Sequence, residues 1–351
     1  MSNVKPSLLF VGPFPPPVHG QSVATKHLAD VLDKTLDVRR IDTAGSSSRR
    51  LSRHALALQQ IIVGREKAIY LSINSNRGII LTAMLARAAR IRGKAIFLHH
   101  HSYRCIGTYG PDMERLIAAA GDKALHITNC GQMSLELRNL YPTVRNTASL
   151  PNIGSVDEAL LPTARPTRPV TIGHMSNLTE EKGLGRALDA FAALLETGIE
   201  ARLEVAGPDA DAFAAAALAE AKTRFGHRFT YHGPVYGERK QAFFNAIDIF
   251  AFPSLYPVET QGIVNLEAMA CGKPVVAFAQ CCIAADIGTT GGSAIGKGES
   301  FSQALIEYAR TYIADPEGRA IMARQRFEEL ATDYRSHLEA LCETISVSAS
   351  T

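Results

Sequence analysis

The chain has 351 residues, of which 46% are hydrophobic and 20% charged, ordinary values for a soluble globular protein with room for two cores. No apolar run approaches the roughly 20 residues that a membrane-spanning helix needs, and the beginning, MSNVKPSLLFVGPFPPP, does not have the pattern of a signal peptide. The six cysteines form no CxxC pair and are too sparse for a disulfide scaffold, so a reducing, cytoplasmic setting is expected.

The net charge of +3 hides an asymmetry between the two halves of the chain. Residues 1–150 hold 20 Lys and Arg against 9 Asp and Glu, whereas the remainder holds 17 against 25. Such a basic half predicts an anionic partner, either a membrane surface or an anionic acceptor, although a solvated face explains any single cluster. Nucleic acid is not expected, because no basic motif is interleaved with aromatic residues. The basic clusters are Arg39, Arg40, Arg49, Arg50 and Arg53, and Arg87, Arg90, Arg92 and Lys94.

The first half of the chain alternates between strand and helix patterns. A buried strand from Ser7 leads through a loop rich in Pro and Gly into a helix over 23–32, without the GxGxxG of a dinucleotide site. Gly20, at the mouth of this helix, would let backbone N–H groups approach a phosphate or sugar; a capping loop without ligand is the alternative. Further strands are predicted at 38–41, 68–72, 95–99 and 124–128, with helices at 51–63 and 78–91.

Three histidines end the strand predicted at 95–99. His99 and His101 should point to one face of the sheet and His100 to the other. Strand ends are where α/β proteins place their chemistry, but each histidine can also be a buried, hydrogen-bonded core residue. No third ligand follows at a suitable spacing, so no metal site is predicted.

The second half repeats the alternation after a stretch rich in Pro, Thr and Arg at 154–169, which has the composition of an interdomain linker. Asp209 and Asp211 form a D-x-D pattern, which in some proteins binds a metal. An alanine-rich helix follows directly, so helix capping is the favoured interpretation. Strands are predicted at 170–174, 201–206 and 229–235, a helix at 183–195, a loop at 291–298 and helices from Phe301 onward.

The segment 248–278, DIFAFPSLYPVETQGIVNLEAMACGKPVVAF, is the most informative of the chain. It predicts a strand, a loop, a helix between Gln261 and Cys271 that ends at Gly272, and another strand. Glu259 lies in the loop and Glu267 in the otherwise apolar helix. The helix N-terminus between the two carboxylates suits a phosphate, and the carboxylates suit hydroxyls on either side of it, which is the layout of a nucleotide sugar. A solvated helix residue and an ordinary loop carboxylate are the alternative.

This segment resembles the signature of retaining glycosyltransferase family 4. The family's pattern is PS, a Glu, seven residues, a second Glu, then AMA, Gly and PVVA. The resemblance implies that Glu259 binds hydroxyls of the donor sugar and Glu267 the ribose, with Gln261 and Gly262 also at the donor. Gln261 stands where the family often has Phe. The matching residues are Pro253, Ser254, Glu259, Gly262, Glu267, Ala268, Met269, Ala270, Gly272 and Pro274.

The resemblance extends to other parts of the chain. Lys182 matches the Lys that holds the donor pyrophosphate in the family, whereas Asn177 takes the place of its Arg. In the loop before the first helix, where Gly20 lies, His19 replaces a usual glycine and is an acceptor-side candidate. His101, followed by Ser102, is the best match to the family's histidine near the acceptor and sugar. His99 is the second choice and also an acceptor-side candidate.

The fold implied by the resemblance is GT-B, with two doubly wound Rossmann-like domains facing across a cleft. The expected boundaries are an acceptor-binding domain at 1–152, a linker at 153–169, a nucleotide-sugar-binding domain at 170–330, and a final helix at 331–351 that packs on the first domain. The implied activity is metal-independent, retaining transfer of a sugar from a UDP- or GDP-sugar to an acceptor hydroxyl. His101, Glu259 and Lys182 would be catalytic, and no cofactor would be needed.

Several alternatives stay open at this point. A nucleotide-sugar 2-epimerase with the same fold would release free sugar without an acceptor, and a nucleotide-sugar-binding protein without activity is conceivable because Asn177 replaces an Arg. The family-level expectation for the acceptor is a glycan or a lipid-linked glycan in bacterial surface polysaccharide or glycolipid synthesis. The protein would then work in the cytoplasm at the inner face of the membrane.

Overall fold

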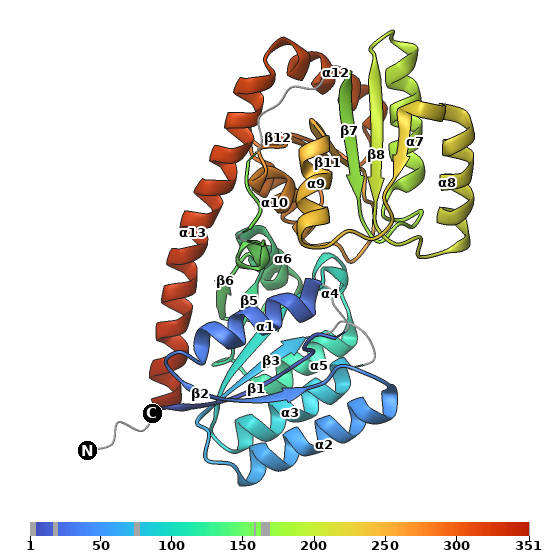
Figure 1. Ribbon diagram of the computed structural model, residues 1–351. Helices are drawn as coiled ribbons and strands as arrows, with labels where there is room; N and C mark the ends of the chain where they lie inside the picture. The colour runs from blue at the N-terminus through green and yellow to red at the C-terminus, as the bar shows by residue number, and fades with distance from the viewer. Residues whose placement is uncertain (1–4, 17–19, 74–77, 158, 163–168, 351) are drawn as a thin grey trace. The chain divides into compact units, whose positions relative to one another are not determined.

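The computed structural model describes residues 5–16, 20–73, 78–157, 159–162 and 169–350. The chain divides into two compact units, one of residues 1–155 with 333–351 and one of residues 156–332. Each unit is built on a six-stranded parallel sheet (Figure 1), which confirms the predicted α/β class and the GT-B fold. Among the described residues, no helix has both the length and the apolarity to cross a membrane.

The sheet of the first unit has the order β2-β1-β3-β4-β5-β6, so the strand order reverses between β1 and β3. Its central strand β3 is buried along its whole length, and Tyr70 of this strand stacks on Phe10 of β1 with ring centroids 4.0 Å apart. Ligands of doubly wound sheets bind at the carboxyl ends of the strands beside such a reversal. The strands are β1 (Ser7–Gly12), β2 (Asp37–Asp42), β3 (Ala68–Ile73), β4 (Ala95–His100), β5 (Leu125–Thr128) and β6 (Asn146–Ser149).

Helix α3 packs against both α2 and α5 beside the first sheet (Figure 1). The long last helix α13 (Pro316–Ser350) begins in the second unit, and its residues from Asp333 onward belong to the first. There, the Tyr334 hydroxyl lies 2.8 Å from Nε2 of His27 on α1. The other helices of this unit are α1 (Gly20–Leu32), α2 (Ser47–Val63), α3 (Ile79–Ile91), α4 (Arg104–Gly107), α5 (Pro111–Ala120), α6 (Gly131–Leu140) and the 3₁₀ turn η1 (Asn152–Ser155).

The second sheet has the order β12-β11-β10-β7-β8-β9, which reverses between β7 and β10. Two predictions need correction here. The loop expected at 291–298 contains strand β12, which pairs with β11 although it is short and has no apolar pattern, because backbone pairing at a sheet edge needs none. The strand expected at 229–235 ends at Tyr231, before Gly233 and Pro234. The strands are β7 (Val170–Met175), β8 (Ala201–Ala206), β9 (Phe229–Tyr231), β10 (Ile249–Phe252), β11 (Val275–Phe278) and β12 (Gly292–Ile295).

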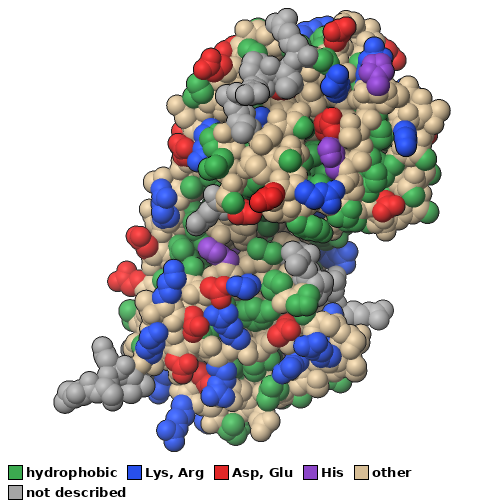
Figure 2. All heavy atoms as spheres, in the orientation of Figure 1, with side chains coloured by type: hydrophobic (Ala, Val, Ile, Leu, Met, Phe, Trp, Pro, Cys, Tyr) green, Lys and Arg blue, Asp and Glu red, His purple; other side chains and the backbone are tan. Residues whose placement is uncertain are grey.

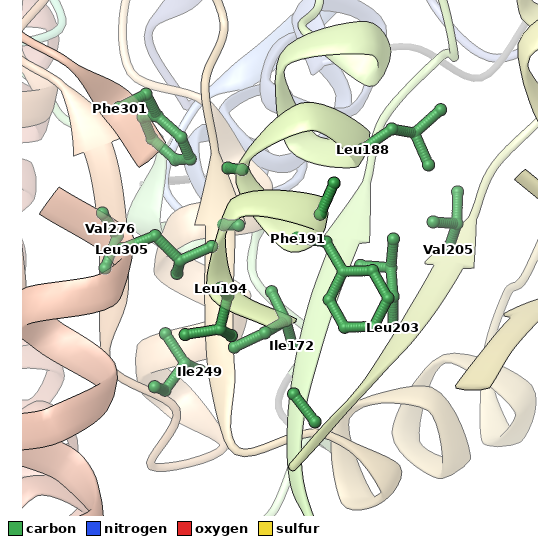
Figure 3. Packing of buried hydrophobic residues seen from close by; sticks show 14 of the residues in the cluster. Ile172, Leu188, Phe191, Leu194, Leu203, Val205, Ile249, Val276, Phe301 and Leu305 are labelled. Carbon is green, nitrogen blue, oxygen red and sulfur yellow. The ribbon is translucent and has the colours of Figure 1, made fainter. Parts of the chain in front are cut away.

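The core of the second unit is formed where α7 and α12 cover the sheet. Phe191 and Leu194 of α7 pack with Leu305 of α12 and with the inward side chains of β7, β8 and β10 (Figure 3). The period of α7, with apolar residues three and four positions apart, produces this buried face. The helices are α7 (Leu184–Glu196), α8 (Ala212–Phe225), the 3₁₀ turn η2 (Gly226–Arg228), α9 (Glu238–Ala246), α10 (Ile263–Ala270), α11 (Ile283–Ile287) and α12 (Phe301–Ala314).

Candidate functional site

Two loops of the second unit meet at the point where the strand order of its sheet reverses, between β7 and β10. One loop, residues 176–183, follows β7, and the other, residues 253–262, follows β10, and these strands are neighbours. The loops are joined by a hydrogen bond from the backbone N–H of Leu255 to the carbonyl of Glu181. Both therefore lie at the carboxyl edge, where doubly wound sheets bind ligands.

Lys182 and Glu259 connect these loops through their side chains. Nζ of Lys182 donates a hydrogen bond to Oε2 of Glu259 at 2.5 Å, and both side chains are largely but not fully buried. The ammonium also lies 4.4 Å from the ring centroid of Tyr256. The structure thus brings together two of the three residues that the sequence predicted to be catalytic, 77 positions apart in the chain.

Arg186 of α7 fixes the backbone around this ion pair. Its guanidinium donates to the carbonyl of Pro253 at 2.9 Å and to those of Glu180 and Glu181 at 3.2 Å. Arg186 was not among the predicted site residues. A cation in the first turn of a helix opposes the helix dipole, and that unfavourable placement was the available signal for a role beyond the helix itself.

Gly262 precedes α10 with a left-handed backbone, φ 63°, and a Cβ there would lie 2.8 Å from Nδ2 of Asn265. Only glycine fits both conditions. The helix begins at Ile263, two residues later than the periodicity indicated, so Gln261 and Gly262 belong to the loop. The first backbone N–H groups of α10 have no partner within the helix, which suits an anion at this end.

Glu267 is buried on α10 and forms an ion pair with Lys240 of α9. Nζ of Lys240 lies 2.7 Å from Oε1 of Glu267, whereas Oε2 has no hydrogen-bond partner among the described residues. Burial raises the pKa of the Glu267 carboxyl and the Lys240 ammonium opposes this rise. The remaining oxygen is therefore an acceptor that a hydroxyl donor would satisfy. Lys240 was also missed, because nothing local in the sequence points to a partner 27 positions away.

Gln261 is buried, and its side-chain amide donates to Oδ1 of Asp286 on α11 at 3.2 Å. Burial raises the pKa of the Asp286 carboxyl to about 7, against the lowering influence of Gln261 and Arg326. Oδ2 of Asp286 has no hydrogen-bond partner among the described residues. The Gln261 amide is thus held by a buried carboxyl that was not among the predicted site residues.

Asn177 lies exposed in the loop that follows β7, in the same loop as Lys182.

The D-x-D pattern at Asp209 and Asp211 has the structural role that was predicted for it. Asp211 is the N-cap of α8 and accepts a hydrogen bond from the backbone N–H of Ala214 at 2.8 Å.

In the first unit, the histidines at the end of β4 take the faces that were predicted. The rings of His99 and His101 lie 3.9 Å apart, and Nδ1 of His99 is hydrogen-bonded to the Tyr70 hydroxyl. His100 faces the other way and its Nε2 lies 2.9 Å from Nδ1 of His126 on β5. Burial and the neighbouring histidines hold the pKa values of His99 and His100 well below the usual range.

His101 is more accessible than His99 and His100, since it follows the last residue of β4. Gly20 is the exposed first residue of α1, as its place at the helix mouth predicted. His19 lies outside the described residues. The structure therefore places His101 and Gly20 in the first unit, and Lys182, Glu259, Gln261, Gly262 and Glu267 in the second.

Residues 158–329 match the family model described as Glycosyl transferases group 1. This match spans nearly all of the second unit, residues 156–332. The chain is also 28% identical, over 189 residues, to the GDP-mannose-dependent alpha-(1-6)-phosphatidylinositol dimannoside mannosyltransferase of Mycobacterium tuberculosis. That match covers 54% of this chain and 47% of the relative, so the chain spans about half the length of the curated relatives it matches.

Similar solved structures cover nearly the whole chain. The complex of Anabaena HepE with UDP has a TM-score of 0.73 at 20% identity and covers 97% of this chain and 100% of HepE. A glycosyltransferase from Rickettsia africae has a TM-score of 0.69 at 14% identity, with 98% of each chain covered. Sucrose-phosphate synthase from Thermosynechococcus elongatus has a TM-score of 0.68 at 16% identity, covering 98% of this chain and 97% of the synthase. At these identities the likeness establishes the fold.

Proposed function

We propose that this chain is a retaining glycosyltransferase that moves a sugar from a nucleoside-diphosphate sugar to an acceptor hydroxyl. The observation that carries the proposal is the Lys182–Glu259 ion pair, which lies at the reversal point of the second sheet beside the N-terminus of α10. The ammonium of Lys182 can bind the diphosphate of a nucleotide sugar, and the carboxylate of Glu259 can accept hydrogen bonds from the hydroxyls of its sugar.

In this proposal, the donor diphosphate lies between Lys182 and the first N–H groups of α10. When the bond from the sugar carbon to the diphosphate breaks, negative charge develops on the leaving oxygen. Preorganised donors around that charge lower the barrier, and such electrostatic stabilisation is often the largest contribution to catalysis. Glu259 would orient the sugar through its hydroxyls and exchange part of its contact with Lys182 for them.

The ribose of the donor would bind at Glu267. Its Oε2 is buried and has no hydrogen-bond partner among the described residues, whereas Oε1 is paired with Lys240. A ribose hydroxyl would donate a hydrogen bond to this oxygen. Gln261, Gly262 and Asn177 would complete the donor site in the second unit.

His101, Gly20, His19 and His99 are proposed for the acceptor side in the first unit. The acceptor oxygen would form the new bond on the face that the diphosphate leaves, and a phosphate oxygen would accept the acceptor's proton. The resemblance supports this same-face course, and no metal or cofactor takes part in it.

The comparisons support UDP or GDP as the nucleoside diphosphate of the donor. HepE was solved with UDP and UDP-glucose, and the mycobacterial relative is named for GDP-mannose and a phosphatidylinositol dimannoside. We propose a glycan or lipid-linked acceptor of bacterial surface polysaccharide or glycolipid synthesis, reached at the inner face of the membrane.

The decisive test is thermal unfolding with a panel of nucleoside diphosphates and nucleotide sugars, without added metal. A ligand that binds only the folded state raises its stability, so one nucleotide should raise the unfolding midpoint and identify the base. The Glu267→Ala variant should lose most of this shift. The absence of any shift, with or without manganese, would contradict the proposal and favour a protein that has lost its donor site.

A second measurement separates transfer from 2-epimerisation. With the matching donor, a transferase should release the nucleoside diphosphate in proportion to acceptor, and the sugar should appear in the glycosylated product. Release of free, epimerised sugar without acceptor would support the 2-epimerase instead.

A further inference from the structure

The amino edge of the first sheet carries a surface that the proposed reaction does not use. Three turns that lead from helices into strands, residues 63–67, 90–95 and 120–124, line an open cavity of about 1050 Å³. Ser348, near the end of α13, completes its lining. We call these turns, together with the last residues of α2 and α3, the amino-edge surface.

Basic side chains dominate this surface. Two of them have structural roles, since Lys94 donates to the carbonyls of Gly64 and Glu66, and Arg90 donates to that of Ala118. The other four are exposed, and none forms a salt bridge with an acidic side chain of the described residues. Of the two acids, Glu66 is paired with Arg39. The charged residues lining the cavity are Arg65, Lys67, Arg90, Arg92, Lys94 and Lys123, with Glu66 and Asp122.

Exposed aliphatic side chains adjoin these cations. Val63 ends α2 and is 68% exposed, Ile91 ends α3 and is 75% exposed, and Ile62 is 49% exposed. Figure 2 shows that charged side chains of both signs lie among hydrophobic ones on the visible face of the first unit. The negative ends of three helix dipoles lie at this edge and favour nearby cations. The helix dipoles do not explain why Val63, Ile91 and Ile62 are exposed to water at this edge.

We infer that the amino-edge surface docks on the anionic face of a lipid bilayer. Exposed cations attract acidic headgroups, and aliphatic side chains beside them enter the boundary between headgroups and acyl chains. The cavity between the three turns would receive a phosphate-bearing headgroup. This edge is opposite the carboxyl ends of the same strands, so docking turns the edge that holds His101 away from the bilayer. A lipid-linked acceptor would then reach His101 through its glycan, which extends from the bilayer, and not through its lipid.

Two other occupants fit this surface less well. A second copy of the chain, joined by two-fold symmetry, would place the same cations against one another, with only two acids among the lining residues to compensate. A nucleic acid would match the charge, but the described residues of this surface include no aromatic side chain on which bases would stack. An acidic bilayer satisfies both the cations and Val63 and Ile91.

The test is co-sedimentation of the full chain with vesicles of phosphatidylcholine alone or of phosphatidylcholine mixed with phosphatidylglycerol. We expect binding to the mixed vesicles only, and we expect added salt to weaken it, because screening acts on exposed charges. One cation near an acidic surface raises the partition coefficient onto the vesicles about fivefold. The double change Arg92→Glu with Lys123→Glu should therefore lower the partition coefficient at least roughly 25-fold. The double change Val63→Ser with Ile91→Ser should also weaken binding to the mixed vesicles.

Matched controls keep the result specific to this surface. Lys222→Glu with Arg228→Glu makes the same change of charge at exposed positions of the second unit, and Leu51→Ser removes an exposed aliphatic side chain, 59% exposed, from the other end of α2. Both control variants should bind vesicles like the unaltered chain. The unfolding midpoint of every variant shows whether it is folded.

Three outcomes would overturn the inference. They are equal binding to both kinds of vesicle, equal losses in the control variants, and self-association that Ile91→Ser abolishes while vesicles have no effect. No nucleotide sugar enters these assays. Their failure would therefore leave the proposed donor site untouched, and failure of the nucleotide assay would leave the docking inference untouched.

Discussion

The ammonium of Lys182 lies 2.5 Å from a carboxylate oxygen of Glu259 across two loops that are joined at the reversal point of the second sheet. Neither side chain is fully buried, so the pair is open to a ligand that competes for both partners. Such an ion pair can open when a diphosphate binds the cation and a hydroxyl binds the carboxylate.

Glu259→Ala and Glu267→Ala should affect the reaction in different ways. Loss of Glu259 should lower kcat/KM for sugar transfer about 100-fold or more, because contacts to the reacting sugar act in the transition state. Loss of Glu267 should raise the donor KM about tenfold with little change in kcat, because one charged hydrogen bond to the ribose is lost. Steady-state kinetics over a range of donor concentrations checks both, and Glu307→Ala, on the exposed side of α12, is the control. Full activity in both variants would exclude the site assignment.

Lys240→Met should destabilise the second unit by about 3 kcal/mol, because Glu267 would remain buried without its partner. Denaturant unfolding measures this loss. The double variant Lys240→Met with Glu267→Gln should recover much of it, since no unpaired charge remains. Lys26→Met breaks an exposed pair with Asp30 and should cost less than about 1 kcal/mol. Equal costs for the two single variants would show that burial of Glu267 does not matter.

Asp286→Asn should stabilise the protein at pH 8 by on the order of 2–4 kcal/mol and have little effect near pH 4. The pKa of the folded-state carboxyl is raised from 3.8 to about 7, so the unfolded chain releases this proton first as pH rises. Stability from this group is therefore present at low pH and lost between about pH 4 and 7. Asparagine keeps an oxygen for Gln261 and does not ionise. Unfolding free energies at several pH values test this, and a pH-independent effect would contradict it.

Lowering the pH should destabilise the protein through its buried histidines, whereas it should stabilise the protein through Asp286. Burial lowers the pKa values of His126 and His174 from 6.5 to about 4, so the unfolded chain takes up protons first as pH falls. Stability from these groups is complete above about pH 6.5 and is lost toward pH 4, by about 3 kcal/mol for each histidine. His126→Gln should flatten this loss in denaturant unfolding, whereas His227→Gln, at an exposed position, should leave it unchanged. An equal acid response in both variants would contradict the assignment.

Sequence periodicity determined most of the fold, because strands and helices bury faces of period 2.0 and 3.6 whatever their tertiary partners. It located the first strands and α7, and it identified the loop with Glu259, because long local patterns carry their own physical signal. It overlooked β12, α9 and α11, which are short and depend on neighbouring strands or helices for their stability.

The partners of the site residues were decided by tertiary structure alone. Lys182 meets Glu259, Lys240 meets Glu267, and Gln261 meets Asp286 across separations of 77, 27 and 25 positions. Which of these side chains are buried, and therefore which pKa values shift, depends on desolvation by elements distant in the chain. The sequence by itself thus determined the chemistry available to this protein, and the packing of its loops and helices decided which charges are paired, buried or open to a ligand.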